Sequence, residues 1–277
     1  MENRHLSLVR EILSAPTEVI DLIEGRVLET REHPWAQTRR RAQPAAASPL
    51  NFLRTGNLRL MLAAAQDEFA IHYQPSVDCD TGVVTHLEAL LRWPSGRVTH
   101  STDEVIRQLE SSEMIVNVGR NILARVCGDL ATLRRQGFPG LTMSMNVSAG
   151  QLGDRGLIPA IEQALRRHRI PPALFQVEIT ETVLAESQSV DAFVRGLLAI
   201  GVGTLVDDFG LGYNNLGMLR SLPVAGLKLD RSFVAGLGKD ARDSLIAETI
   251  VGLAKALQII TIAEGVETES PARWLRR

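Results

Sequence analysis

Two adjacent carboxylates, Asp207 and Asp208, follow the apolar run of residues 203–206 and precede the glycine-rich turn of residues 209–212. Burying two carboxylates at the end of an apolar strand costs free energy unless a positive charge compensates for them. A divalent metal ion or a fixed cation supplies that charge. The sequence therefore indicates that the aspartate pair belongs to a functional site that binds a cation.

Polar side chains also stand near the ends of other expected strands: Glu88, Asn146, Glu178 with Glu181, Lys228 and Glu264. Apart from the lysine, all of them offer oxygen ligands, and no histidine or cysteine takes part. Oxygen ligands are typical of a hard ion such as Mg²⁺ or Mn²⁺ and do not favour zinc. This pattern predicts a site for divalent cations.

The adjacent aspartates suggest room for two ions, since one carboxylate can bridge both ions while its neighbour binds the second. Such a pair stabilises the attacking and leaving oxygens of a phosphodiester displacement. Lys228 would then orient or help to activate the attacking water. Glu264 would act as a ligand or as a general base.

Each of these residues also has a purely structural interpretation. Glu88 could pair with Arg92, Asn146 could cap a turn, Glu178 and Glu181 could complement a helix dipole, Lys228 could pair with Asp230, and Glu264 and Glu267 could flank a turn. The turn at residues 210–212 could be a phosphate cradle, a gate over the site or an ordinary loop. The metal site is favoured because all the structural alternatives would have to hold at once.

Strands and helices alternate along the chain from about residue 57. Strands are expected over residues 69–73, 83–91, 141–147, 175–179, 203–209, 226–229 and 259–263. Helices are expected over residues 116–135, 158–169, 190–200 and 244–257, with Gly137 and Gly201 as helix-ending glycines. This alternation predicts a mostly parallel sheet covered by helices.

Seven strands over this length favour a (β/α) barrel. A doubly wound sheet is less favoured, because no Gly-x-Gly-x-x-Gly sequence follows a strand. In a barrel the carboxyl ends of the parallel strands meet at one mouth, where active sites form. The polar residues named above should therefore lie close together.

The remainder of the chain sets limits on function. Its 277 residues are 45% hydrophobic and 22% charged, with a net charge of −2, so no argument for nucleic-acid binding arises. No apolar run reaches the ~18 residues of a membrane span, and we expect a cytoplasmic protein with two reduced thiols, Cys79 and Cys127. Residues 1–33 predict two short amphipathic helices, either packing against another chain or solvated, and the Pro/Ala-rich stretch up to residue 56 predicts a linker.

Several motifs resemble those of the EAL-domain cyclic-di-GMP phosphodiesterases of bacteria. The segment Glu88-Ala89-Leu90-Leu91-Arg92-Trp93 resembles the signature that names this family. The remaining motifs follow in order: Tyr73-Gln74-Pro75, Asn146-Val147-Ser148 with Gln151-Leu152, Glu178-Ile179-Thr180-Glu181, Asp207-Asp208-Phe209-Gly210, Leu227–Val234 and Ala263–Thr268. The resemblance covers residues 57–277.

The resemblance implies a modified TIM barrel with an antiparallel first strand, and opening of cyclic di-GMP to linear pGpG with two Mg²⁺ or Mn²⁺ ions. It also implies a homodimer or a partner signalling protein. The resemblance further implies that one metal is held by Glu88, Asn146, Glu178 and Asp207, and a second by Asp207, Asp208 and Glu264. It implies that Lys228 and Glu264 act on the nucleophilic water. It also implies that Glu181 anchors the glycine loop and that Gln74 and Arg92 contact the nucleotide.

Departures from the family pattern qualify this expectation. The loop after the aspartate pair reads Gly210-Leu211-Gly212-Tyr213-Asn214-Asn215, where the family usually has Gly-Thr-Gly-Tyr-Ser-Ser. Only 13 residues follow Glu264, too few for a further crossover and strand, so we expect the barrel to lack its last strand and helix. A catalytically weak or inactive cyclic-di-GMP receptor or protein-interaction module is therefore the alternative function.

Overall fold

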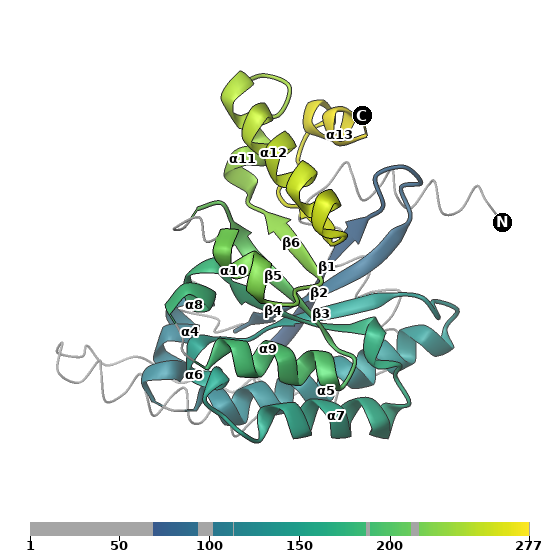
Figure 1. Ribbon diagram of the computed structural model, residues 1–277. Helices are drawn as coiled ribbons and strands as arrows, with labels where there is room; N and C mark the ends of the chain where they lie inside the picture. Colours follow the sequence, from purple (N-terminus) through teal and green to yellow (C-terminus); the bar gives the residue numbers. More distant parts are fainter. Residues whose placement is uncertain (1–68, 94–101, 113, 187–188, 212–215, 277) are drawn as a thin grey trace, which may run out of the picture.

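The computed structural model describes residues 69–93, 102–112, 114–186, 189–211 and 216–276. These residues form a curled seven-stranded sheet in the order β1 to β7, with helices against its outer side (Figure 1). The strands are β1 (Ala70–Val77), β2 (Val84–Arg92), β3 (Thr142–Asn146), β4 (Phe175–Thr180), β5 (Gly203–Phe209), β6 (Gly226–Leu229) and β7 (Ile260–Ala263). β1 is antiparallel to β2, and each later strand is parallel to its predecessor.

The helices occupy the connections between strands and the segment after β7. They are α4 (Thr102–Ser111), α5 (Ile115–Arg135), α6 (Ala149–Leu152), α7 (Leu157–His168), η2 (Pro172–Leu174), α8 (Glu181–Glu186), α9 (Val190–Ala199), α10 (Leu216–Ser221), α11 (Arg231–Ala235), α12 (Ala241–Leu257) and α13 (Glu269–Leu275). Helix α5 packs on β3, α9 on β5, and α12 on β6 and β7. No helix within the described ranges combines the length and the apolar character that crossing a bilayer requires.

Two glycines end helices where the sequence predicts it. Gly137 follows the C-cap of α5 with φ of +106°, and Gly201 follows the C-cap of α9 with φ of +82°. Glycine adopts this left-handed conformation without the steric cost that a Cβ imposes. These turns redirect the chain from each helix into the following strand.

Alternation along the strands separates an apolar face from a polar face. Met143 and Met145 on β3, Val177 on β4 and Leu227 on β6 are at most 2% exposed and belong to the core under the helices. The residues between them point to the opposite face, because side chains alternate along a strand. That opposite face carries the polar residues Glu88, Ser144, Glu178 and Lys228, all of which are buried.

Strand β1 extends further than the sequence predicts. The expected strand stopped at residue 73, but β1 continues through Pro75 to Val77, with an irregular register between Ser76 and Val77. Proline cannot donate to a ladder and is therefore confined to edge strands and bulges. β1 tolerates Pro75 because it lies at the edge of the described sheet.

The fold class predicted from the sequence is confirmed: a partial (β/α) barrel with an antiparallel first strand. Among the described strands, β1 and β7 are not paired with each other, and the residues after β7 form α13. Ile260 on β7 is consequently 49% exposed. The helical segment and linker predicted for residues 1–56 lie outside the described residues and stay predictions.

Candidate metal centre

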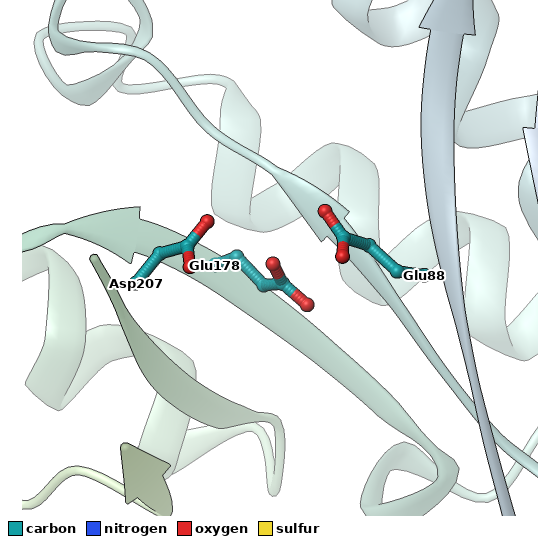
Figure 2. A group of neighbouring side chains, drawn as sticks. All are labelled: Glu88, Glu178 and Asp207. Carbon is teal, nitrogen blue, oxygen red and sulfur yellow. The ribbon is translucent and has the colours of Figure 1, made fainter. Parts of the chain in front are cut away.

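Carboxylates from separate strands converge at one place on the polar face of the sheet. Glu88 lies on β2, Glu178 on β4 and Asp207 on β5, and one carboxylate oxygen of each lies within 4.8 Å of the other two. Figure 2 shows the three carboxylates turned toward a common centre. The parallel register staggers these side chains: the partner of Glu178 on β3 is Asn146, and the partner of Asp207 on β4 is Thr180, two residues beyond Glu178.

The Lys228 ammonium lies in the middle of this group. Its Nζ is 2.5 Å from Glu178 Oε2, 2.7 Å from Glu264 Oε1, 3.0 Å from Glu88 Oε2 and 3.1 Å from Asp207 Oδ1. The side chain of Lys228 is 3% exposed. One buried cation therefore compensates four carboxylates that belong to four strands or their ends.

A second carboxylate group lies nearer the solvent. Oxygens of Asp207, Asp208 and Glu264 are also within 4.8 Å of one another. The exposed fraction of the side chains rises from 0% at Glu178 to 13% at Asp207 and 24% at Glu264. Asp207 belongs to both carboxylate groups.

Burial and crowding shift the acidity of this cluster. Burial and the neighbouring Glu178 raise the pKa of Glu88 to about 7, against the opposing effect of Lys228. Burial likewise raises the pKa of Asp207 and of Glu264 above the ordinary range. For Glu178 burial acts upward, but His86, Lys228 and Ser144 outweigh it, so its pKa is lowered.

The pKa of Lys228 is raised, because the surrounding carboxylates outweigh the effect of burial. The lysine therefore stays protonated and the carboxylates remain close to a positive charge. An oxygen-rich group of this kind that already surrounds a cation fits a hard divalent ion, and these acidic residues could hold a metal.

The turn after the aspartate pair contains two residues with positive φ. Asp208 has φ of +54° and Gly210 has φ of +103°. Backbone N–H groups of the turn bond to carboxylates: the Asp208 N–H donates to Asp207 Oδ1 at 2.9 Å, and the Gly210 N–H donates to Glu181 Oε2 at 2.9 Å. Glu181, at 2% exposure the first residue of α8, is thereby bound to this turn.

The structure places the other predicted site residues on β1, on β2 and at the end of β3. The Asn146 Nδ2 donates to Glu88 Oε1 at 2.9 Å, instead of capping the following turn. Gln74 is exposed and lies directly opposite Glu88 in the β1–β2 ladder, so the two share a face. Arg92, at the end of β2, donates to the Leu91 carbonyl at 2.9 Å.

The structural alternatives for Lys228 and Asp230 do not describe what is observed. Among the described ion pairs, those of Lys228 are with carboxylates of the cluster and not with Asp230. Asp230 instead caps α11, accepting from the Ser232 N–H at 2.8 Å. The sequence left open whether Lys228 pairs with Asp230 or belongs to the site. In the structure Lys228 lies among the carboxylates of the cluster.

Comparison with known proteins agrees with this geometry. The sequence matches the EAL domain over residues 57–277, which is most of the chain. The chain belongs to the EAL domain family. In this EAL domain the naming triplet Glu88-Ala89-Leu90 lies on β2 and contributes Glu88 to the cluster.

Among its relatives, this EAL domain is 34% identical over 222 residues to the bifunctional diguanylate cyclase/cyclic di-GMP phosphodiesterase MucR of Pseudomonas aeruginosa, covering 79% of the chain and 32% of MucR. It is 33% identical to the probable cyclic di-GMP phosphodiesterase PdeN of Escherichia coli, covering 78% of the chain and 42% of PdeN. The chain thus spans about a third of the length of the first of these relatives.

Solved structures of EAL domains share the fold. The PaMucR phosphodiesterase in complex with c-di-GMP superimposes with a TM-score of 0.73 at 32% identity, covering 79% of this chain and 90% of that chain. The EAL enzyme Bd1971 in its cAMP-bound form gives 0.76 at 27% identity, covering 82% of this chain and 64% of that one. The arrangement of strands that positions the carboxylates is therefore shared with both.

Two buried residues beside the cluster were not predicted from the sequence as part of the site. His86 is 6% exposed and Ser144 is 0% exposed, and both contact each other next to Glu178. The signal was available, because His86 and Ser144 each precede a predicted ligand by two residues and therefore share its face of the sheet. Only the pairing of strands shows that they meet.

Proposed function

We propose that this EAL domain hydrolyses cyclic di-GMP to linear pGpG with two Mg²⁺ or Mn²⁺ ions. The observation that carries the proposal is the convergence of Glu88, Glu178, Asp207 and Glu264 around one buried positive charge, that of Lys228. The names of the relatives MucR and PdeN and the c-di-GMP complex of PaMucR support this choice of substrate.

Two overlapping groups of residues would hold the ions. One ion would be held by Glu88, Asn146, Glu178 and Asp207, and the other by Asp207, Asp208 and Glu264. When bound, the ions would stabilise charge on the phosphodiester oxygens and make a bound water acidic enough to react.

The protein's own side chains would orient the reactants. Lys228 would hold the attacking water by a hydrogen bond, since its ammonium already lies among the carboxylates. Glu264, the most exposed of the Lys228 partners, would accept the proton of that water. Gln74 and Arg92 would contact the nucleotide beyond the cluster, and Glu181 would hold the Gly210 turn.

A non-hydrolytic receptor or interaction module is the second candidate. One observation favours it: β1 and β7 are unpaired with each other in the described sheet, so the cluster is not enclosed by a closed barrel there. A receptor would bind cyclic di-GMP without producing pGpG. The homodimer or partner signalling protein and the cytoplasmic location predicted from the sequence stay predictions.

The test compares the wild type with Asp207→Asn and with Asp191→Asn. Asp207 belongs to both carboxylate groups, whereas Asp191 is an exposed residue of α9 paired with Arg195. With Mn²⁺ present, we expect wild-type pGpG production to fall roughly 100-fold or more in Asp207→Asn, the scale of losing one essential electrostatic group, and to be unchanged in Asp191→Asn. A folded wild type that binds cyclic di-GMP but forms no pGpG would favour the receptor instead.

A further inference from the structure

A chain of hydrogen bonds runs from Glu178 across the polar face of the sheet. The Ser144 hydroxyl donates to Glu178 Oε1. The His86 Nε2 lies 2.8 Å from Ser144 Oγ, and the His86 Nδ1 lies 2.9 Å from Thr142 Oγ1. The chain links β4 to β3 and β2, and ends at Thr142, whose Oγ1 also lies 3.0 Å from the Thr85 carbonyl oxygen.

The proton of the Ser144 hydroxyl sets the direction of this chain. A serine hydroxyl has one proton, and that proton is donated to the Glu178 carboxylate. The His86 Nε2 therefore acts as the donor to Ser144 Oγ. His86 in this orientation keeps the serine proton directed at Glu178.

The two oxygens of Glu178 consequently have different partners. Oε1 accepts from Ser144, while Oε2 is 2.5 Å from Lys228 Nζ at the centre of the cluster. Because Glu178 is 0% exposed, these buried contacts stand in for solvent around its carboxylate. The hydrogen bond from Ser144 fixes Oε1, and Oε2 is thereby directed at Lys228 in the centre of the cluster.

The fold does not require a polar residue at the position beside Glu178. Leu205, the partner of Glu178 in the β4–β5 ladder, lies on the same face and is fully buried. An apolar side chain is thus accommodated next to Glu178 without disturbing the fold. The polar character of His86 and Ser144 serves the carboxylate that they support.

We propose that His86 and Ser144 are positioning residues that fix the Glu178 carboxylate for binding a divalent cation. The inference deepens the proposed function and rests on it, because it concerns the same site. Groups that hydrogen-bond a metal ligand orient it before the ion arrives, and removing such a group typically lowers metal affinity by about 10–100-fold. His86 acts through Ser144, and Ser144 acts through Glu178.

The experiment measures Mn²⁺ binding by titration calorimetry without nucleotide, so it does not depend on hydrolysis. Ser144→Ala removes the donor to Glu178, His86→Leu removes the donor to Ser144, and His86→Gln keeps an N–H donor. Thr204→Val is the matched control, because Thr204 is a buried strand hydroxyl, 1% exposed, with no hydrogen-bond partner among the described residues.

We expect Mn²⁺ affinity to fall about 10–100-fold in Ser144→Ala and about 10-fold in His86→Leu. His86→Gln should stay within about threefold of the wild type, and Thr204→Val should match it. A second readout is the Mn²⁺ concentration that gives half-maximal pGpG formation, which should rise in Ser144→Ala while excess Mn²⁺ restores the rate. A purely structural loss would not be restored by metal.

Wild-type Mn²⁺ affinity in both Ser144→Ala and His86→Leu would overturn the inference. So would an equal loss of affinity in His86→Gln and His86→Leu, because the donor would then be irrelevant. If Ser144→Ala does not fold, Ser144→Cys keeps the shape with a weaker donor, and unchanged affinity there would overturn the inference as well. Weakened Mn²⁺ binding without any wild-type pGpG would instead count against the proposed function alone.

Discussion

At the residue scale, Lys228 is the centre of the candidate site. Its ammonium is the buried positive charge that lets four carboxylates from different strands lie together. A buried charge cluster depends on all of its partners, because removing one leaves the others without compensation. Lys228 therefore has a structural role in addition to its proposed role at the water.

Replacing Lys228 by methionine tests this structural role. Without a metal, we expect Lys228→Met to lower the free energy of unfolding by about 3–5 kcal/mol, because buried carboxylates lose their counter-charge. Mn²⁺ should restore much of the loss by supplying another cation. Thermal unfolding in EDTA and in Mn²⁺ measures both effects, with Lys255→Met on the exposed side of α12 as the control.

An equal loss in EDTA and in Mn²⁺ would show that Lys228 acts through packing instead.

Asp208 is a second residue whose backbone matters as well as its carboxylate. Its φ of +54° is one that L-residues rarely adopt, and that asparagine tolerates better than β-branched residues do. We expect Asp208→Asn to unfold at nearly the wild-type temperature, and Asp208→Val to lose about 1–2 kcal/mol from the left-handed conformation. Calorimetric unfolding of both variants in EDTA checks this, and equal stabilities would contradict it.

At the scale of elements, β1 depends on a side-chain contact with α5. β1 lies at the edge of the described sheet and is paired with β2 alone. The Tyr73 hydroxyl donates to Asp129 Oδ2 on α5 at 2.6 Å. This bond fastens the antiparallel strand to a long helix, and with it Gln74, the residue that faces Glu88.

Tyr73→Phe removes that bond and leaves the Asp129 carboxylate without it. We expect the free energy of unfolding at neutral pH to fall by about 1.5–3 kcal/mol, the usual contribution of a hydrogen bond to a charged group. Urea titration of the wild type and of Tyr73→Phe measures the difference. An unchanged urea midpoint would mean that the β1–β2 ladder alone holds the strand.

The same bond gives a pH dependence whose sign follows from the raised pKa of Tyr73. Burial, followed by Asp129, raises the pKa of the Tyr73 phenol well above 10. The folded state therefore favours the protonated phenol, and its contribution is fully present below the unfolded value of about 10. As the pH rises above that value the contribution is lost, so wild type and Tyr73→Phe should approach each other in stability.

At the scale of the whole molecule, a large apolar core joins the sheet to its helices, and a smaller apolar cluster lies around α4. Cys127 on α5 is 0% exposed within this core, whereas Cys79, in the turn after β1, is exposed. Burial raises the pKa of the Cys127 thiol to about 12, so little thiolate forms in the folded protein. The two thiols should report on different states of the chain.

We expect a thiol reagent to modify Cys79 rapidly and Cys127 on global unfolding, slower by a factor of roughly 10³ or more. Mass spectrometry of each cysteine over time measures the two rates, and Cys79→Ser isolates the slow one. Adding Mn²⁺ should slow Cys127 modification further, because an ion bound to the folded state stabilises the whole unit. Rapid modification of Cys127 in the native protein would show that the partial barrel opens locally.

Much of the fold follows from local patterns. The strand at residues 203–209 was predicted with the boundaries of β5, and that at residues 226–229 with those of β6, because apolar runs between glycines and helices determine them. Short helices such as α10 and α11 were not predicted, since they contain too few residues for a clear apolar period. The second half of β1 was not predicted, because Pro75 argues against a strand unless that strand lies at a sheet edge. Only the tertiary structure shows that β1 is an edge strand.

The sequence by itself determined which residue types could bind a hard cation and on which strand each lies, because composition and alternation are local properties. Only the tertiary structure decided that Lys228 lies among four carboxylates and that His86 reaches Glu178 through Ser144. Those contacts join residues on strands separated by whole helices, and the curl of the sheet, which no local pattern specifies, brings them together.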